Sequence, residues 1–248
     1  MAVKIPDYIV NQTLYEGVTA YERYTVVDSR YNNRPARILY TDNQMAAQSG
    51  LPFDDKSEML FDYNQRFMEL VSGLLPKNVL VIGGGAFTLP MAIHTQFPAV
   101  QVDVYELDGE LIKISERYFG LKRDSKLTVS IGDGLELLKK SKVKYDLILI
   151  DVFNSTEIPK EFNRPELPDI LSARLKTNGV VAMNVIAAYH GVRAEMLKTI
   201  EQSFKRTFND VKVFPAGSAI SLWMTQNFLV VGGLNISSAT KALSYKPI

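Results

Sequence analysis

The chain has 248 residues, of which 46% are hydrophobic and 22% charged, enough for one large domain with a small appendage. Its 28 lysines and arginines nearly balance its 27 aspartates and glutamates, so the net charge gives no general field for polyanions and we expect no nucleic-acid partner. With no cysteine and two histidines, and no apolar run approaching the roughly 20 residues that span a bilayer, we expect no metal, no membrane association and a cytoplasmic location.

The N-terminal part of the chain has the composition of a small β module. Residues 8–50 are rich in tyrosine, threonine and valine, with turn-forming pairs at Asn32–Asn33 and Asp42–Asn43, which predicts two or three short antiparallel strands. We therefore divide the chain into a β module over residues 1–55 and an α/β domain over residues 56–248.

The rest of the chain alternates between strand and helix patterns. After Ser57, which is placed to cap it, a helical spacing of apolar residues predicts a helix that leads into the main domain. Beyond Pro76, short and nearly continuous apolar runs are typical of parallel strands buried on both faces, and the last two runs, with no helix between them, predict an antiparallel hairpin. The pattern favours a doubly wound, mostly parallel, Rossmann-like α/β sheet. We expect strands at 79–82, 100–106, 127–131, 147–150 and 179–186, helices at 87–96, 109–118, 134–141, 166–175 and 190–207, and hairpin strands at 211–214 and 228–233.

Three consecutive glycines, Gly83, Gly84 and Gly85, stand between the first strand of this sheet and its helix. Backbone can approach a ligand closely at such a junction, and helix N-terminal amides can donate to its polar atoms. Glu106 ends the second strand, 21 residues after Gly85, where a carboxylate can accept hydrogen bonds from ribose hydroxyls. Together they predict a nucleoside site, although a tight turn without a ligand would use the same glycines. The G-x-G-x-x-G fingerprint of nicotinamide-binding folds has a third glycine where this chain has Thr88. A nicotinamide-dependent oxidoreductase is therefore a less favoured alternative.

Two more acids follow predicted strands. Asp133 comes after the third strand and Asp151 after the fourth. Ligands in open α/β sheets bind beyond the carboxyl ends of the strands, so Glu106, Asp133 and Asp151 are expected to converge on one crevice. Asp133 by itself is equally well explained as a helix cap.

The order of these segments resembles a known family. The runs VLVIGGGAFTLPMAI, VDVYELDGELIKISERYF, VSIGDGLELLKK and YDLILIDVFN are similar to the nucleoside-binding half of spermidine synthases. Upstream, VTAYERYTVVDS, RILYTDNQMAAQSG and FDYNQRFMEL are similar to that family's N-terminal β module and linking helix. The resemblance covers roughly residues 15 to 185.

The resemblance implies a donor, decarboxylated S-adenosylmethionine, whose aminopropyl group is transferred to a diamine. It implies that Glu106 binds the ribose, that Asp133 and Gly134 lie near the adenine amino group, and that the Gly83–Gly85 turn runs along the sulfonium side. Gln48 and Glu22 are weaker matches to donor-site residues. The family also implies a homodimer formed through the N-terminal strands.

The same resemblance implies catalytic residues. Asp151 matches the first acid of the family's D-S-[ST]-D-P motif, and Tyr63 matches a tyrosine that helps to orient the attacking amine. The second acid of that motif, which deprotonates the amine, is Asn154 here, and an amide is no base near neutral pH.

Other departures point the same way. The aspartate of the family's GGGDGG loop is replaced by Ala86, and the histidine and glutamate that follow the family tyrosine are replaced by Asn64 and Gln65. Buried ammonium groups need anionic partners, so these replacements argue against ordinary spermidine synthesis and leave room for ordinary S-adenosylmethionine.

Two hypotheses of function remain open. The first is a transferase that uses S-adenosylmethionine or its decarboxylated form to alkylate a small acceptor such as an amine. The second is a non-catalytic nucleoside-binding or sensor protein of the same fold, which the neutral Asn154 and Ala86 favour.

Overall fold

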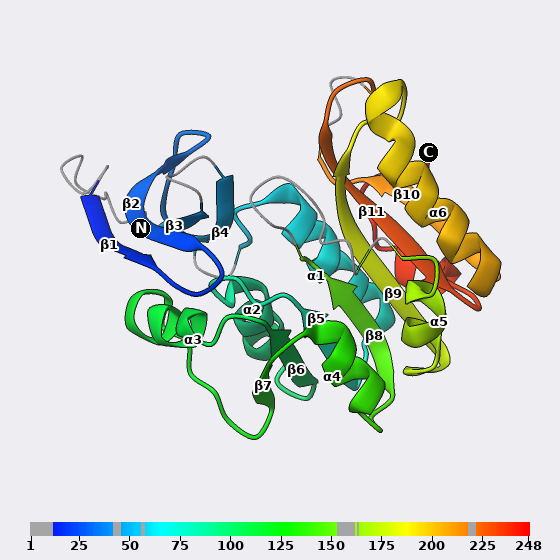
Figure 1. Cartoon of the computed structure of the whole chain (residues 1–248), viewed down its shortest axis with the longest axis horizontal. Coiled ribbons are helices and arrows are strands. Elements are labelled where there is room, and N and C mark those ends of the chain that lie inside the picture. The colour runs from blue at the N-terminus through cyan, green and yellow to red at the C-terminus, as the bar shows by residue number, and fades with distance from the viewer. Residues whose placement is uncertain (1–11, 42–45, 56–57, 153–161, 163, 218–221) are drawn as a thin grey trace.

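The computed structural model describes residues 12–41, 46–55, 58–152, 162, 164–217 and 222–248. They form two sheets, a small one near the N-terminus and a large one flanked by helices, which lie beside each other in Figure 1. The expected boundary between residues 55 and 56 stays a prediction.

The small sheet is antiparallel, and each strand pairs with the next in the chain. Its strands are β1 (Gln12–Val18), β2 (Arg23–Tyr31), β3 (Arg34–Thr41) and β4 (Ala46–Pro52). The β2–β3 turn is made by Asn32 and Asn33, whose φ angles of 49° and 65° are those that a two-residue hairpin turn requires. Two or three strands were expected, and the described residues form four. The additional strand is β4, which was missed because it is made mostly of alanine, serine and glycine. These residues have low strand propensity, so pairing with β3 defines this strand.

The large sheet confirms the predicted Rossmann-like fold with its C-terminal antiparallel hairpin. Its spatial order is β10-β11-β9-β8-β5-β6-β7, in which β5 to β9 run parallel and β11 runs antiparallel to both of its neighbours, β9 and β10. The bounds are β5 (Asn78–Ile82), β6 (Gln101–Glu106), β7 (Leu127–Ile131), β8 (Tyr145–Ile150), β9 (Leu175–Ala187), β10 (Asp210–Pro215) and β11 (Gln226–Gly233).

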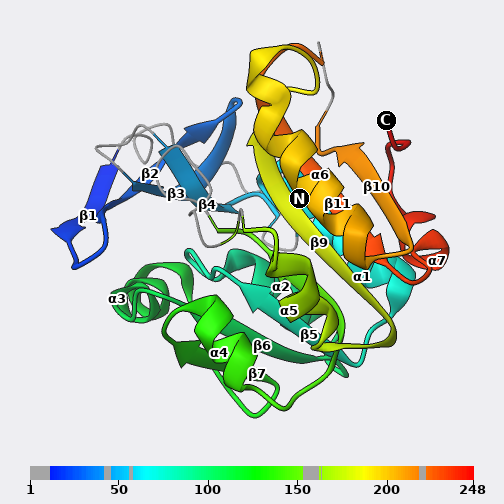
Figure 2. The same cartoon turned by 45° about the vertical axis from the view of Figure 1, so that its right-hand side comes forward.

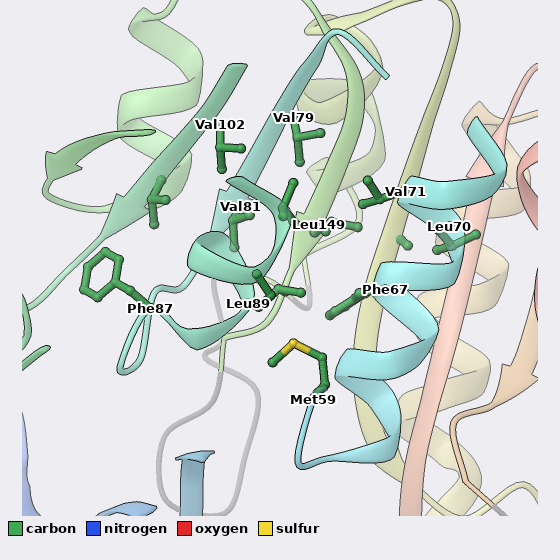
Figure 3. Close-up of a cluster of buried hydrophobic side chains, with 14 of the residues drawn as sticks. Met59, Phe67, Leu70, Val71, Val79, Val81, Phe87, Leu89, Val102 and Leu149 are labelled. Carbon is green, nitrogen blue, oxygen red and sulfur yellow. The ribbon is translucent and has the colours of Figure 1, made fainter. Parts of the chain in front are cut away.

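Helices cover both faces of this sheet. They are α1 (Asp62–Leu74), α2 (Thr88–Gln96), α3 (Glu110–Ile114), α4 (Gly134–Lys140), α5 (Leu167–Ser172), α6 (Glu195–Thr207) and α7 (Ser237–Thr240). Figure 3 shows Phe67, Leu70 and Val71 of α1 on the same side of the sheet as Val79 and Val81 of β5, within one buried cluster. On the opposite face α6 lies across β9 and β11, as Figure 2 shows.

Several predicted bounds are wrong for local reasons. Helix α1 begins at Asp62 with Phe61 at its N-cap and no side-chain cap bond, so the predicted serine cap is not used; Ser57 lies outside the described residues. The helix predicted at 109–118 changes after α3 into a π-helical turn, Ser115–Phe119. The helix predicted at 190–207 starts only at Glu195, after a 3-10 turn.

Strand β9 is longer than predicted, and the preceding helix α5 is shorter. The segment before Gly179 carries lysine, threonine and asparagine, which indicate a turn, yet Leu175 pairs with Tyr145 of β8. A register irregularity follows this pair, and irregular pairing of this kind at the start of a strand cannot be read from apolar periodicity. In the part of the chain that is described, no helix is both long and apolar enough to cross a bilayer.

The small sheet is attached to the large domain by side chains from β3 and from the β1–β2 turn. Arg37 on β3 donates to the backbone oxygen of Tyr118 at 2.6 Å and makes two hydrogen bonds to Asp28 at 2.7 and 2.9 Å. Thr19, in the β1–β2 turn, donates to the Asp108 carboxylate. These contacts hold the small sheet above the carboxyl ends of β5 and β6.

Candidate active site

A cavity of about 430 Å³ opens where the small sheet faces the carboxyl ends of the parallel strands. Its volume is in the range of small-molecule sites. Among its described lining residues, five are carboxylic acids and none is lysine, arginine or histidine. The acids are Glu22, Glu106, Asp108, Asp133 and Asp151, and the other lining residues include Tyr21, Tyr24, Thr41, Gln48, Ser49, Gly83, Gly84, Gly85, Tyr105, Gly134 and Phe162.

The Gly83–Gly85 turn brings backbone to the cavity wall. Gly83 and Gly85 have φ angles of 92° and 52°, in the left-handed region that favours glycine. A Cβ on Gly83 would lie 2.1 Å from the backbone oxygen of Asp151, and one on Gly85 would lie 2.5 Å from the Ser49 hydroxyl. The turn therefore needs glycine because Asp151, at the tip of β8, and Ser49, on β4, approach it closely.

The N–H groups of this turn are already bonded within the protein. Gly83 donates to the backbone oxygen of Tyr105 at 2.9 Å, Gly84 to the Glu106 carboxylate at 2.6 Å, and Gly85 also to Glu106. Ala86 donates to the Ser49 hydroxyl at 2.9 Å, and the N–H of Phe87 to the oxygen of Gly84 at 2.7 Å. No N–H from residue 83 to residue 87 is therefore left for an anionic ligand group.

Glu106 connects the glycine turn to the end of β6. It is 7% exposed and also accepts a hydrogen bond from the N–H of Asp108 at 2.8 Å. Burial raises the pKa of Glu106, and the N–H donors of Asp108, Gly84 and Gly85 oppose that rise. The carboxylate is held in one place at the cavity wall, with lone pairs that a hydroxyl-bearing ligand could use.

Asp108 is a lining acid that the sequence analysis did not single out. It is buried and accepts hydrogen bonds from Thr19, from Tyr24 and from the N–H of Glu110. Burial, followed by the charges of Asp108 and Glu106, raises the pKa of Tyr24, so this phenol stays protonated and donates. The signal in the sequence was a second acid two residues after Glu106, at the same strand end.

Asp151 stands at the tip of β8, and its N–H donates to the oxygen of Ile82 at 2.9 Å. Its carboxylate accepts a hydrogen bond from the amide of Asn184 at 3.0 Å and another from the Tyr63 hydroxyl. Burial raises the pKa of Asp151 to about 6, against the opposing effect of these two hydrogen bonds. This carboxyl group can thus take up and release a proton near neutral pH.

Tyr63, from α1, does not line the cavity and reaches the site only through Asp151. Burial and the neighbouring Asp151 charge raise its pKa well above the ordinary value. The tyrosine is therefore a hydrogen-bond donor to Asp151 across the physiological range.

The remaining candidate residues fall into two groups. Asp133, Gly134 and Gln48 line the cavity. Asp133 also caps α4 by accepting from the N–H of Glu136 at 2.8 Å, which confirms its role as a helix cap, while its role in ligand binding stays a prediction. Gln48 donates to Thr41 at 3.2 Å. Asn154 lies outside the described residues.

Ala86 directly follows the Gly83–Gly85 turn. The residue is fully buried and is absent from the described lining of the cavity. That the replacement of the family's aspartate by Ala86 leaves room for a donor carboxylate stays a prediction. Within the described ranges no cluster of three or more metal-ligating side chains occurs.

Comparison with known sequences points to one family. A family model described as the spermine/spermidine synthase domain matches residues 59–233. The chain is 31% identical over 124 residues to a polyamine aminopropyltransferase of Vibrio vulnificus (strain CMCP6), covering 47% of this chain and 42% of that protein. It is 28% identical over 145 residues to an eEF1A lysine and N-terminal methyltransferase of Xenopus laevis, covering 53% of this chain and 21% of that protein. The matched part is thus less than half of either relative.

Among solved structures, the chain is similar to a probable spermidine synthase from Corynebacterium glutamicum ATCC 13032. The TM-score is 0.79, the alignment covers 96% of this chain and 91% of that one, and the sequence identity is 17%. At this identity the likeness shows the fold, including the small sheet in front of the large one.

Proposed function

Since the chain belongs to the spermine/spermidine synthase family, we propose that it is a transferase that binds a donor of the S-adenosylmethionine type and alkylates a small amine. The observation that carries this proposal is Asp151, a carboxyl group with a pKa of about 6 at the wall of a cavity lined by acids. Such a group is ionised at neutral pH and can accept a proton from the amine as the amine attacks the donor.

Six of the lining residues would hold the donor. Glu106, fixed by backbone donors at the end of β6, would accept from the ribose hydroxyls. Asp133 and Gly134, at the start of α4, would face the adenine, and the Gly83–Gly85 turn would pass beside the sulfonium. The donor supplies a carbon that its sulfonium already makes electrophilic, so the protein mainly positions the two reactants.

The charges of the cavity favour the decarboxylated donor. Ordinary S-adenosylmethionine carries a carboxylate, which would find no basic side chain among the described lining residues and no unbonded N–H in the turn from Gly83 to Phe87. A buried charge without a partner is costly. The decarboxylated donor lacks this carboxylate and keeps only the ammonium, which Asp151 or another lining acid can pair. We therefore propose aminopropyl transfer.

The acceptor amine would react at Asp151. As the amine nitrogen forms a bond to the donor carbon, the carbon–sulfur bond breaks, its electron pair stays on sulfur, and the amine proton passes to the Asp151 carboxylate. Tyr63 keeps its own proton and orients this carboxylate.

Methyl transfer is the second candidate, favoured by the similarity to the eEF1A lysine and N-terminal methyltransferase. Mass spectrometry of amine mixtures incubated with each donor separates the two. An added mass of one aminopropyl group with the decarboxylated donor supports the first proposal, and an added methyl group with the ordinary donor supports the second. Nucleoside binding by calorimetry without turnover of either donor would favour the non-catalytic sensor.

Three further expectations stay predictions. A titration with reduced nicotinamide cofactor, followed by fluorescence, tests the oxidoreductase alternative. Sedimentation analysis tests the homodimer through the N-terminal strands, and fractionation of cells tests the cytoplasmic location.

A further inference from the structure

Two asparagines lie behind Asp151 where the sheet would be expected to be apolar. Asn184 on β9 continues the stripe formed by Val180 and Ala182, which belong to the buried cluster under α1. It is 1% exposed. A buried amide in such a stripe costs stability unless its hydrogen bonds are made, so its partners indicate what it does.

Asn184 has a partner on each side. Its Nδ2 donates to Oδ1 of Asp151 at 3.0 Å, and its Oδ1 accepts from Nδ2 of Asn227 at 3.0 Å. Asn227 lies on β11, the antiparallel neighbour of β9, where Leu229 is paired with Asn184. Asn227, two residues away, is therefore on the same face of the sheet.

The direction of this hydrogen-bond chain follows from the chemistry of its end. An ionised carboxylate can only accept, so Asn184 must turn its NH₂ group towards Asp151. Its carbonyl oxygen then points to β11 and needs a donor there, which Asn227 supplies. A reversed Asn184 would place an oxygen against the carboxylate and favour its protonated form.

We propose that Asn184, oriented by Asn227, is a positioning residue that keeps Asp151 ionised and directed towards the acceptor. This inference rests on the role proposed above for Asp151. The other groups around Asp151 are the neutral Tyr63 from α1 and the acids Glu106 and Asp133, which line the same cavity from β6 and the start of α4. No basic side chain is among the described cavity-lining residues, so neutral donors carry the task of stabilising the carboxylate.

The test is a titration of the Asp151 carboxyl by carbon NMR in the free protein, which needs no turnover. Asn184→Leu removes the donor and is expected to raise the pKa of Asp151 by about one, to about 7, because a hydrogen bond to a charged group is lost. Asn227→Asp keeps the size of the side chain but offers an acceptor to Asn184. We expect Asn184 to turn and the pKa to rise at least as far.

The matched control is Val185→Ala, a buried neighbour on β9 whose side chain belongs to the cluster on the other face. It is expected to lower the melting temperature and leave the pKa of Asp151 within about 0.3 of wild type. In turnover assays, the acid limb of kcat should move upward in both asparagine variants and stay in place in the control.

The two ways to fail are distinguishable. Unchanged pKa values in Asn184→Leu and Asn227→Asp overturn the inference, as does an equal shift in Val185→Ala. Full turnover by Asp151→Asn would overturn the proposed proton acceptor itself, and with it any catalytic purpose for the pair.

Discussion

Replacing Asp151 with asparagine should stabilise the protein at neutral pH. The pKa of about 6 against an ordinary 3.8 means that ionising this group costs the folded state about 3 kcal/mol more than the unfolded state. In the unfolded chain the group ionises near pH 4, whereas in the folded chain it stays protonated up to about pH 6. Stability contributed by this residue is therefore full below pH 4 and lost as the pH rises through 6.

Asparagine avoids this loss but keeps an oxygen for Tyr63 and Asn184. Its NH₂ group cannot accept the hydrogen bond that the second carboxylate oxygen accepted, and the loss of this bond costs about 1 kcal/mol. We expect Asp151→Asn to be about 2 kcal/mol more stable than wild type at pH 7.5, and to lose this advantage by pH 4.5. Urea unfolding at several pH values between these limits measures the difference.

The control lies at the other end of the same strand. Burial would raise the pKa of Asp146, but the Lys176 ammonium and the N–H groups of Asn78 and Lys77 together lower it. Asp146→Asn should therefore destabilise the protein at pH 7.5, with an effect that shrinks as the pH falls below about 4. A stability difference between Asp151→Asn and wild type that does not vary with pH would refute the reasoning.

Three further substitutions test the site and its support. Gly83→Ala should lower the free energy of unfolding by at least about 2 kcal/mol and abolish nucleoside binding in calorimetry, because the new Cβ would lie 2.1 Å from the Asp151 backbone oxygen. The control is Gly120→Ala, which should lower it by only about 1 kcal/mol, because Gly120 has a φ of 79° but open space around it. Glu106→Gln should weaken nucleoside binding at least tenfold, since its NH₂ group would face the N–H donors of Gly84 and Asp108; binding within threefold of wild type would contradict this role. Arg37→Met should lower the free energy of unfolding in urea by about 2 kcal/mol, because it leaves the buried Asp28 carboxylate and the Tyr118 backbone oxygen without their partner. An unchanged unfolding midpoint would show that other contacts hold the small sheet.

The strand ends were predictable because parallel sheets impose a simple rule. Side chains that follow consecutive strands meet at one edge, and Gly85, Glu106, Asp133 and Asp151 share one cavity as that rule requires. Apolar runs also located the central strands, since β5, β6 and β8 are mostly buried, whereas β7 at the edge of the sheet is largely exposed.

What could not be predicted depends on contacts between distant segments. Thr19 and Tyr24 meet Asp108 only because the small sheet folds over the large one. Asn184 and Asn227 are 43 positions apart and become neighbours through strand pairing. Neither contact leaves a periodic signal in the sequence, and a single asparagine within an apolar strand carries no indication of the group that it serves.

The loss of an acid at Ala86 has a different meaning once the turn is seen in three dimensions. In the sequence it suggested a cavity that tolerates the carboxylate of the ordinary donor. In the structure the N–H of Ala86 is bonded to Ser49, its side chain is buried, and five acids remain on the described cavity wall. The preference for one donor would therefore depend on the charges of the residues that line the cavity. Acids without a neighbouring cation repel a carboxylate whatever the side chain at Ala86. A decarboxylated donor that binds no better than the ordinary one, in parallel calorimetric titrations, would show that this electrostatic argument is wrong.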